Sequence, residues 1–114
     1  MPATKNDLIK WFQIGVKNNQ SHMIIECDTY NFDDFPIYTN SLEEFEEEYK
    51  KVSSRRNQIM EVYDLKIDMN LQMNEDRAFH YPEGFKVQDL YYPEISKVYK
   101  QGVQNENRTT KVRV

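Results

Sequence analysis

The spacing of apolar residues changes along this chain of 114 residues, from helical to strand-like and back. Between residues 4 and 19 they recur three or four positions apart, which is typical of an amphipathic helix. The apolar run at residues 23–25 is too short for a stable helix and is rich in β-branched side chains. Helical spacing returns at residues 42–53, after a capping box in which Ser41 and Glu44 bond each other's backbone amides. The alternation predicts an α+β fold.

The predicted fold is a small antiparallel sheet packed against helices. The segment at residues 55–67 is ambiguous, because alternating apolar residues indicate a strand whereas its Met, Leu, Gln and Glu favour a helix. We prefer a strand there, central in the sheet because it is apolar on both faces. Pro36 lacks a backbone donor, which places its strand at a sheet edge or makes Pro36 its start. The expected strands lie near residues 22–28, 35–39 and 58–66, and the expected helices near 5–19, 42–53 and 68–79.

Composition limits the class of protein. Fifteen aromatic residues supply an apolar core for one domain, which we expect over residues 1–99 and before a polar tail at 100–114. The net charge of −4 makes nucleic acid an unlikely partner. A single cysteine forbids an internal disulfide. No secretory signal and no membrane-length apolar run is visible, so the cytosol is the expected location, with no membrane partner.

Standard catalytic and cofactor motifs are absent from the sequence. Its three glycines stand far apart, so there is no glycine-rich phosphate loop. His22, His80 and Cys27 are not spaced as zinc ligands, and we expect no metal site and no cofactor. Cys27 fits a buried strand position better than a nucleophile, because the sequence shows neither a base within reach nor a helix N-terminus that would lower its pKa. An enzyme is therefore less expected than a binding protein.

The segment at residues 27–38 is the main candidate for a functional site. It combines carboxylates, which can bind a cation or transfer a proton, with rings that can insert into a partner. The alternative is a purely structural role, in which the segment is a tight hairpin whose aspartates set the turn and whose rings cover the core. We favour a partner-binding surface, because rings that face water are unfavourable without a partner. Its residues are Asp28, Tyr30, Phe32, Asp33, Asp34, Phe35 and Tyr38.

Two charged segments allow further interpretations. Adjacent Arg55 and Arg56 suit either a phosphate group or the negative end of the preceding helix. The glutamates at residues 43–48 resemble a phosphate mimic, although a solvated helix face is commoner. The aromatic residues and the expected edge strand also favour self-association into a homo-oligomer.

Four stretches of the sequence carry a family resemblance. They read SHMIIECDT at residues 21–29, DDFPIY at 33–38, EVYDL at 61–65 and RAFH at 77–80. Residues 6–81 resemble a group of small uncharacterised phage and prophage proteins. The resemblance implies expression in a bacterial cytosol and action on the host, and it implies no catalytic or binding residue.

Three functions follow from these features, in order of preference. The first is a protein that binds a host protein or complex, for example as an inhibitor of host defence. The second is a binder of a small anionic, nucleotide-like ligand that uses Arg55, Arg56 and tyrosine rings. The third is a metal-dependent hydrolase that uses Asp28, Asp33 or Asp34 with a histidine.

Overall fold

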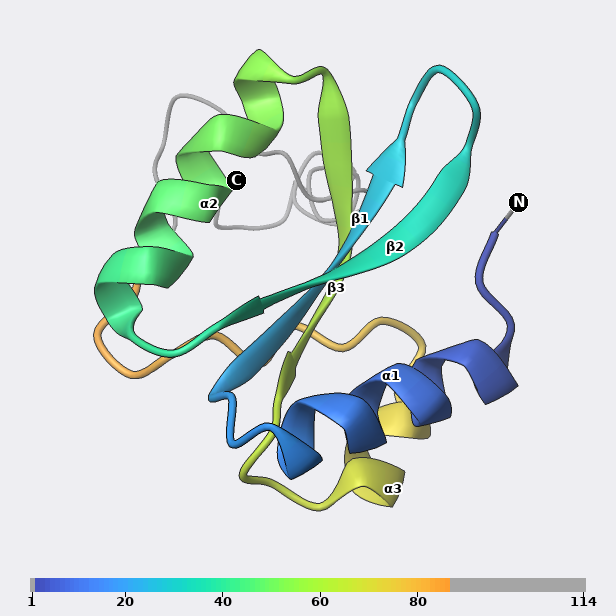
Figure 1. The fold of residues 1–114 in the computed structure, drawn as a ribbon, viewed down its shortest axis with the longest axis vertical. Coiled ribbons are helices and arrows are strands. Elements are labelled where there is room, and N and C mark those ends of the chain that lie inside the picture. The colour runs from blue at the N-terminus through green and yellow to red at the C-terminus, as the bar shows by residue number, and fades with distance from the viewer. Residues whose placement is uncertain (1, 87–114) are drawn as a thin grey trace, which may run out of the picture.

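The computed structural model describes residues 2–86, so the predicted tail lies outside the described residues (Figure 1). Three helices and three strands follow one another along this part of the chain. None of the helices in these residues combines the length and apolarity that a membrane span requires. In chain order they are α1 (Lys5–Lys17), β1 (His22–Asp28), β2 (Asp33–Thr39), α2 (Leu42–Ser54), β3 (Asn57–Asp64) and α3 (Met69–Met73).

The strands form one antiparallel sheet in the order β2-β1-β3, which confirms the predicted α+β fold. His22 at the start of β1 lies between Thr39 of β2 and Asp64 of β3. Both β2 and β3 run antiparallel to β1, so these two outer strands run in the same direction as each other. A chain that leaves β2 and enters β3 must therefore return along the sheet, and α2 makes this return (Figure 1).

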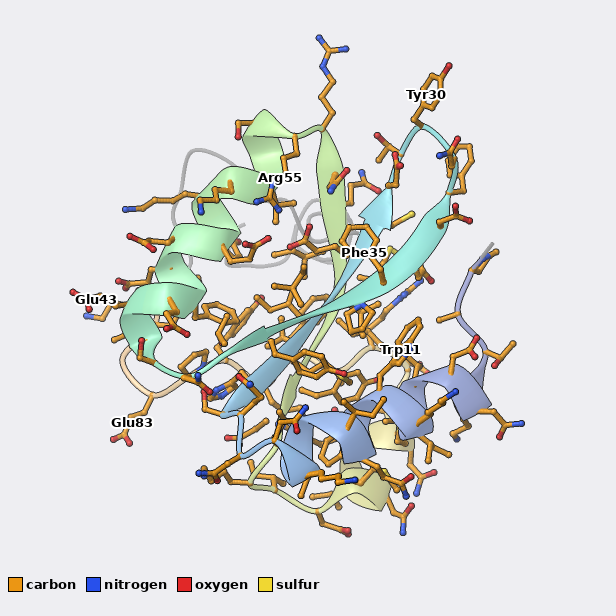
Figure 2. All side chains as sticks on the ribbon, in the orientation of Figure 1. Trp11, Tyr30, Phe35, Glu43, Arg55 and Glu83 are labelled. Carbon is orange, nitrogen blue, oxygen red and sulfur yellow. The ribbon has the colours of Figure 1, made fainter. Side chains whose placement is uncertain are left out.

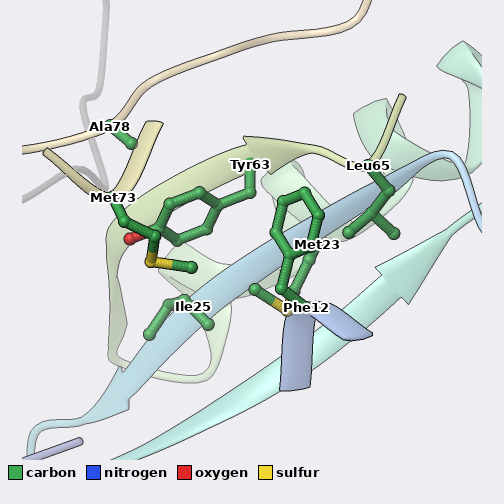
Figure 3. Close-up of a cluster of buried hydrophobic side chains, with 7 residues drawn as sticks. All are labelled: Phe12, Met23, Ile25, Tyr63, Leu65, Met73 and Ala78. Atoms are coloured by element: carbon green, nitrogen blue, oxygen red, sulfur yellow. The ribbon is translucent and has the colours of Figure 1, made fainter. Parts of the chain in front are cut away.

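Helices cover both faces of the sheet, with α2 on one side and α1 and α3 on the other (Figure 1). The buried apolar side chains form two clusters, one on each face of the sheet. The cluster under α1 and α3 contains Phe12, Met23, Ile25, Tyr63, Leu65, Met73 and Ala78 (Figure 3). The cluster under α2 contains Ile24, Phe45, Tyr49, Val52, Ile59 and Val62.

The central position in the sheet belongs to β1 and not to the third strand as predicted. β3 is apolar on both faces because helices cover both faces of the sheet. This pattern does not show whether a strand has one or two neighbouring strands within the sheet. One side of β3 pairs with β1. Along its other side, residues 2–86 provide a parallel bridge between Val62 and Phe79, in which Val62 donates to the Ala78 carbonyl and His80 donates to that of Val62.

The predicted helix at residues 68–79 is largely wrong, because α3 covers only Met69–Met73. Asp68 occupies the N-cap position of α3, but its side chain makes no capping hydrogen bond. Backbone groups of residues 78–80 pair with β3, so they are not available to a helix. Pairing with the sheet therefore overrides the local preference of this segment for helix.

The capping box predicted at α2 forms only in half, because Ser41 Oγ accepts from the Glu44 amide at 3.1 Å but Glu44 Oε1 accepts from the Asn40 amide and not from that of Ser41. At α1, Thr4 and Asp7 form a reciprocal capping box. The capping bonds lower the pKa of Asp7. β2 is an edge strand of the three-stranded sheet, which explains how it accommodates Pro36, although it begins at Asp33 and not at residue 35.

Gly15 brings α1 close to the sheet. A Cβ atom at this position would lie 2.7 Å from Leu65 Cδ1 and 2.8 Å from Tyr38 Cε1. The hydroxyl of Tyr38 donates to the Trp11 carbonyl at 2.7 Å, which limits the movement of its ring. We expect Gly15→Ala to lower the free energy of unfolding by about 1 to 2 kcal/mol, despite alanine's better helix propensity.

Urea denaturation of Gly15→Ala and of Gln13→Ala, an exposed position of the same helix, measures this effect. The Gln13 variant should stay within about 0.5 kcal/mol of the parent protein. A Gly15→Ala protein that is more stable than the parent would show that α1 can move away from the sheet at no cost.

Candidate functional site

A short turn joins β1 to β2 at one end of the sheet. The Asp28 side chain accepts a hydrogen bond from the amide of Tyr30 at 2.8 Å, and the Asp28 carbonyl accepts one from the amide of Phe32 at 2.6 Å. Phe32 has a positive φ of 60°, a conformation that glycine adopts more readily than other residues. The turn is thus held in one conformation by Asp28 and by its own backbone.

Two aromatic rings of this turn face solvent. Tyr30 is 88% exposed and Phe32 is 65% exposed. Figure 2 shows the Tyr30 side chain at the far end of the hairpin, directed away from the body of the protein. These two residues form the tip surface. A pair of exposed rings on an ordered turn is able to insert into an apolar pocket.

The other members of the predicted site are more closely tied to the fold. Asp34 Oδ2 accepts a hydrogen bond from the Ala3 amide at 2.9 Å, which ties the N-terminal segment to β2. Phe35 is half-buried, and so is Tyr38, which packs against the cluster under α1. Burial raises the pKa of the Tyr38 hydroxyl. Asp33 lies exposed at the first position of β2.

The structure separates the two arginines that the sequence places side by side. Arg55 Nη1 donates to Glu48 Oε2 at 2.8 Å and lies 3.8 Å from Glu26 Oε1. Arg56 is exposed with a φ of 62°, and its carbonyl accepts a hydrogen bond from the Thr29 hydroxyl. This bond ties the α2–β3 turn to the hairpin turn. Arg55 thus pairs with glutamates whereas Arg56 is exposed, and the phosphate-binding role of the two arginines stays a prediction.

The two histidines lie in different polar groups. The Nδ1 atom of His22 is 3.0 Å from Ser21 Oγ, and its Nε2 atom is 3.6 Å from Asp64 Oδ2. Burial lowers the pKa of His22, and Asp64 partly opposes this change. His80 Nε2 lies 2.8 Å from Glu75 Oε1.

The aspartates of the hairpin do not form a metal site with these histidines. His22 and Asp28 stand at opposite ends of β1. Within residues 2–86, no three or more histidine, cysteine, aspartate or glutamate side chains are grouped as metal ligands. The hydrolase hypothesis therefore lacks a ligand set in this part of the chain.

The Cys27 thiol is buried in β1. Burial and, after it, the nearby Asp34 carboxylate raise the pKa of this thiol. A raised pKa reduces the fraction of thiolate, which is the nucleophilic form. The side chain therefore fits the structural role that the sequence favours over a nucleophile.

Sequence reasoning missed a set of buried polar side chains. Glu26 is fully buried, Glu61 and His22 are nearly so, and Gln72 of α3 is fully buried. The Tyr63 hydroxyl donates to Glu61, and burial raises the pKa values of both groups. The available signal was a charged residue within an apolar strand, as in Ile24-Ile25-Glu26-Cys27, because buried carboxylates need partners.

Comparisons with family models, with curated proteins and with solved structures find no match to this chain. The resemblance to small phage proteins therefore stays a prediction. Arguments about function come from the geometry of the described residues.

Proposed function

We propose that this protein binds a partner protein through the tip surface formed by Tyr30 and Phe32. The observation that carries the proposal is the exposure of both rings, 88% and 65%, on a turn that hydrogen bonds hold in place. An ordered turn loses little conformational entropy on binding, so more of the ring-burial free energy appears as affinity. The chemistry predicts a partner with an apolar pocket.

The backbone at Phe32 adds support. A non-glycine residue with φ near +60° is strained by about 1 kcal/mol, and glycine would relieve that strain. In this conformation the Phe32 ring is exposed and belongs to neither buried cluster. If the phage resemblance is correct, the expected partner is a protein of the bacterial host.

The proposal is tested by a photo-crosslinking amino acid placed at Asn31, between the two rings. Bacterial lysate is the source of partners, and the variants are the parent, Phe32→Gly and Leu71→Ala. Leu71 is a suitable control because it is 61% exposed on α3, far along the chain from the tip. We expect one crosslinked protein with the parent and Leu71→Ala, and its loss with Phe32→Gly.

For the purified pair we expect the dissociation constant to rise at least roughly 30-fold in Phe32→Gly, the effect of removing one binding hot spot. Phe32→Gly should change the free energy of unfolding by less than about 1 kcal/mol, because relief of strain opposes the entropy of glycine. Equal binding by Phe32→Gly and the parent would contradict the proposal.

A further inference from the structure

A buried polar cluster lies where the end of β1, the middle of α2, the α2–β3 turn and the start of β3 meet. Its centre is Glu26, which has no exposed surface. Glu26 Oε1 accepts a hydrogen bond from Asn57 Nδ2 at 3.3 Å and lies 3.8 Å from Arg55 Nη1. Glu26 Oε2 is buried and has no hydrogen-bond partner. An ionised carboxylate with an unpartnered oxygen in this position would be strongly disfavoured.

A second carboxylate explains the unpartnered oxygen. Glu48 of α2 is 12% exposed, and it holds Arg55 Nη1 at 2.8 Å, one ångström closer than Glu26 does. One arginine balances one carboxylate, and its shorter contact assigns it to Glu48. A proton on Glu26 would remove the second negative charge and supply a donor. Burial and, after it, the adjacent Glu48 raise the pKa of Glu26 to about 8.

We propose that Glu26, Glu48 and Arg55 form a proton-dependent latch, which holds the end of α2 and the α2–β3 turn on the sheet while Glu26 is protonated. When Glu26 ionises, it competes with Glu48 for Arg55 and draws water toward the buried site. The groups that face it are Glu48 from α2, Arg55 from the turn and neutral Asn57 from β3. On β2 its register partner is the apolar Phe35.

The latch is linked to the hairpin through the backbone. Arg56 follows Arg55, and its carbonyl accepts the hydrogen bond from the Thr29 hydroxyl. Asp28 and Asn57 are register partners at the same end of the sheet. A turn released by ionisation of Glu26 therefore loosens the residues that support the tip surface. This regulation needs no partner protein to be observed, so it is independent of the proposed function.

The direction of the pH effect follows from the pKa of Glu26. Its value of about 8 in the folded protein is above the usual 4.5 that applies to the unfolded chain. Between these values the folded protein holds one more proton than the unfolded chain. The contribution of Glu26 to stability is therefore complete below pH 4.5 and is lost as the pH rises to about 8.

Hydrogen exchange of the full chain between pH 6 and 9.5 tests the latch, after correction for the intrinsic pH dependence of exchange. Above pH 8 we expect amides of residues 50–57 and 29–32 to exchange about tenfold faster in the parent protein. Glu26→Gln should abolish this acceleration. Glu61→Gln is the matched control, since it changes another buried glutamate and should leave the acceleration intact.

A carboxyl ¹³C titration of the unmodified protein provides a second measurement that does not depend on the folding of a variant. A midpoint for Glu26 near pH 8 supports the latch, and Glu48→Gln should lower this midpoint because it removes the neighbouring charge. A midpoint below about pH 6, or the same local acceleration in Glu26→Gln, would overturn the proposal.

Discussion

Phe45→Ala is expected to lower the free energy of unfolding by about 3 to 5 kcal/mol, the range for removing a large aromatic side chain from a core. Phe45 has no exposed surface. Its ring lies at the centre of the interface between α2 and the sheet, with ring centroids of its neighbours 4.9–6.2 Å away. Those neighbours are His22, Tyr49, Tyr81 and Phe85.

The matched control for this prediction is Phe32→Ala, the same substitution at a ring that is 65% exposed. It should change the free energy of unfolding by less than about 0.5 kcal/mol, as exposed positions usually do. Chemical denaturation followed by far-ultraviolet circular dichroism measures both variants. Similar losses for the two would mean that the ring of Phe32 packs in the folded protein, which would also remove the basis of the tip surface.

Gln72→Leu is expected to destabilise the protein by about 2 to 4 kcal/mol, although leucine is close to glutamine in volume. Gln72 is fully buried and connects the end of β3 to α3. Its Oε1 atom accepts from the Asp64 amide at 2.8 Å, and its Nε2 atom donates to the carbonyls of Asp64 at 2.8 Å and Ile67 at 3.2 Å. Leucine can make none of these three hydrogen bonds, although the Asp64 carbonyl keeps the Ile67 amide as a donor.

Gln13→Leu is the control, because Gln13 is exposed on α1 and the chemical change is identical. The midpoint temperature of thermal unfolding is measured for both variants at equal concentration. We expect Gln13→Leu to unfold at the same temperature as the parent protein and Gln72→Leu to unfold at a lower temperature. If Gln72→Leu matched or exceeded the parent, the hydrogen bonds at the end of β3 would contribute nothing net to stability.

The predicted site is divided by the structure into two kinds of residue. Tyr30 and Phe32 face solvent as a binding surface requires, whereas Tyr38 packs under α1 and Asp28 and Asp34 bond backbone amides. Sequence spacing located the hairpin but did not distinguish these roles. The reason is that the orientation of a side chain in a turn depends on local backbone angles, here the positive φ of Phe32.

Local pattern alone determined much of the fold. Apolar spacing predicted α1 and α2, and the predicted cap of α2 by Ser41 forms because it bonds the Glu44 amide only three residues away. The short apolar run at residues 23–25 predicted β1 because such a run cannot support a helix of its own. These signals depend on neighbours in sequence, so no tertiary information was needed.

Only the tertiary structure decided the features that depend on distant partners. It made β1 the central strand, ended α3 at Met73 in favour of backbone pairing with Val62, and enclosed Glu26 beside Glu48 and Arg55. Burial, sheet order and the protonation of a carboxyl group depend on residues that are tens of positions away in sequence. Apolar periodicity shows which face of an element is buried but not what lies against it.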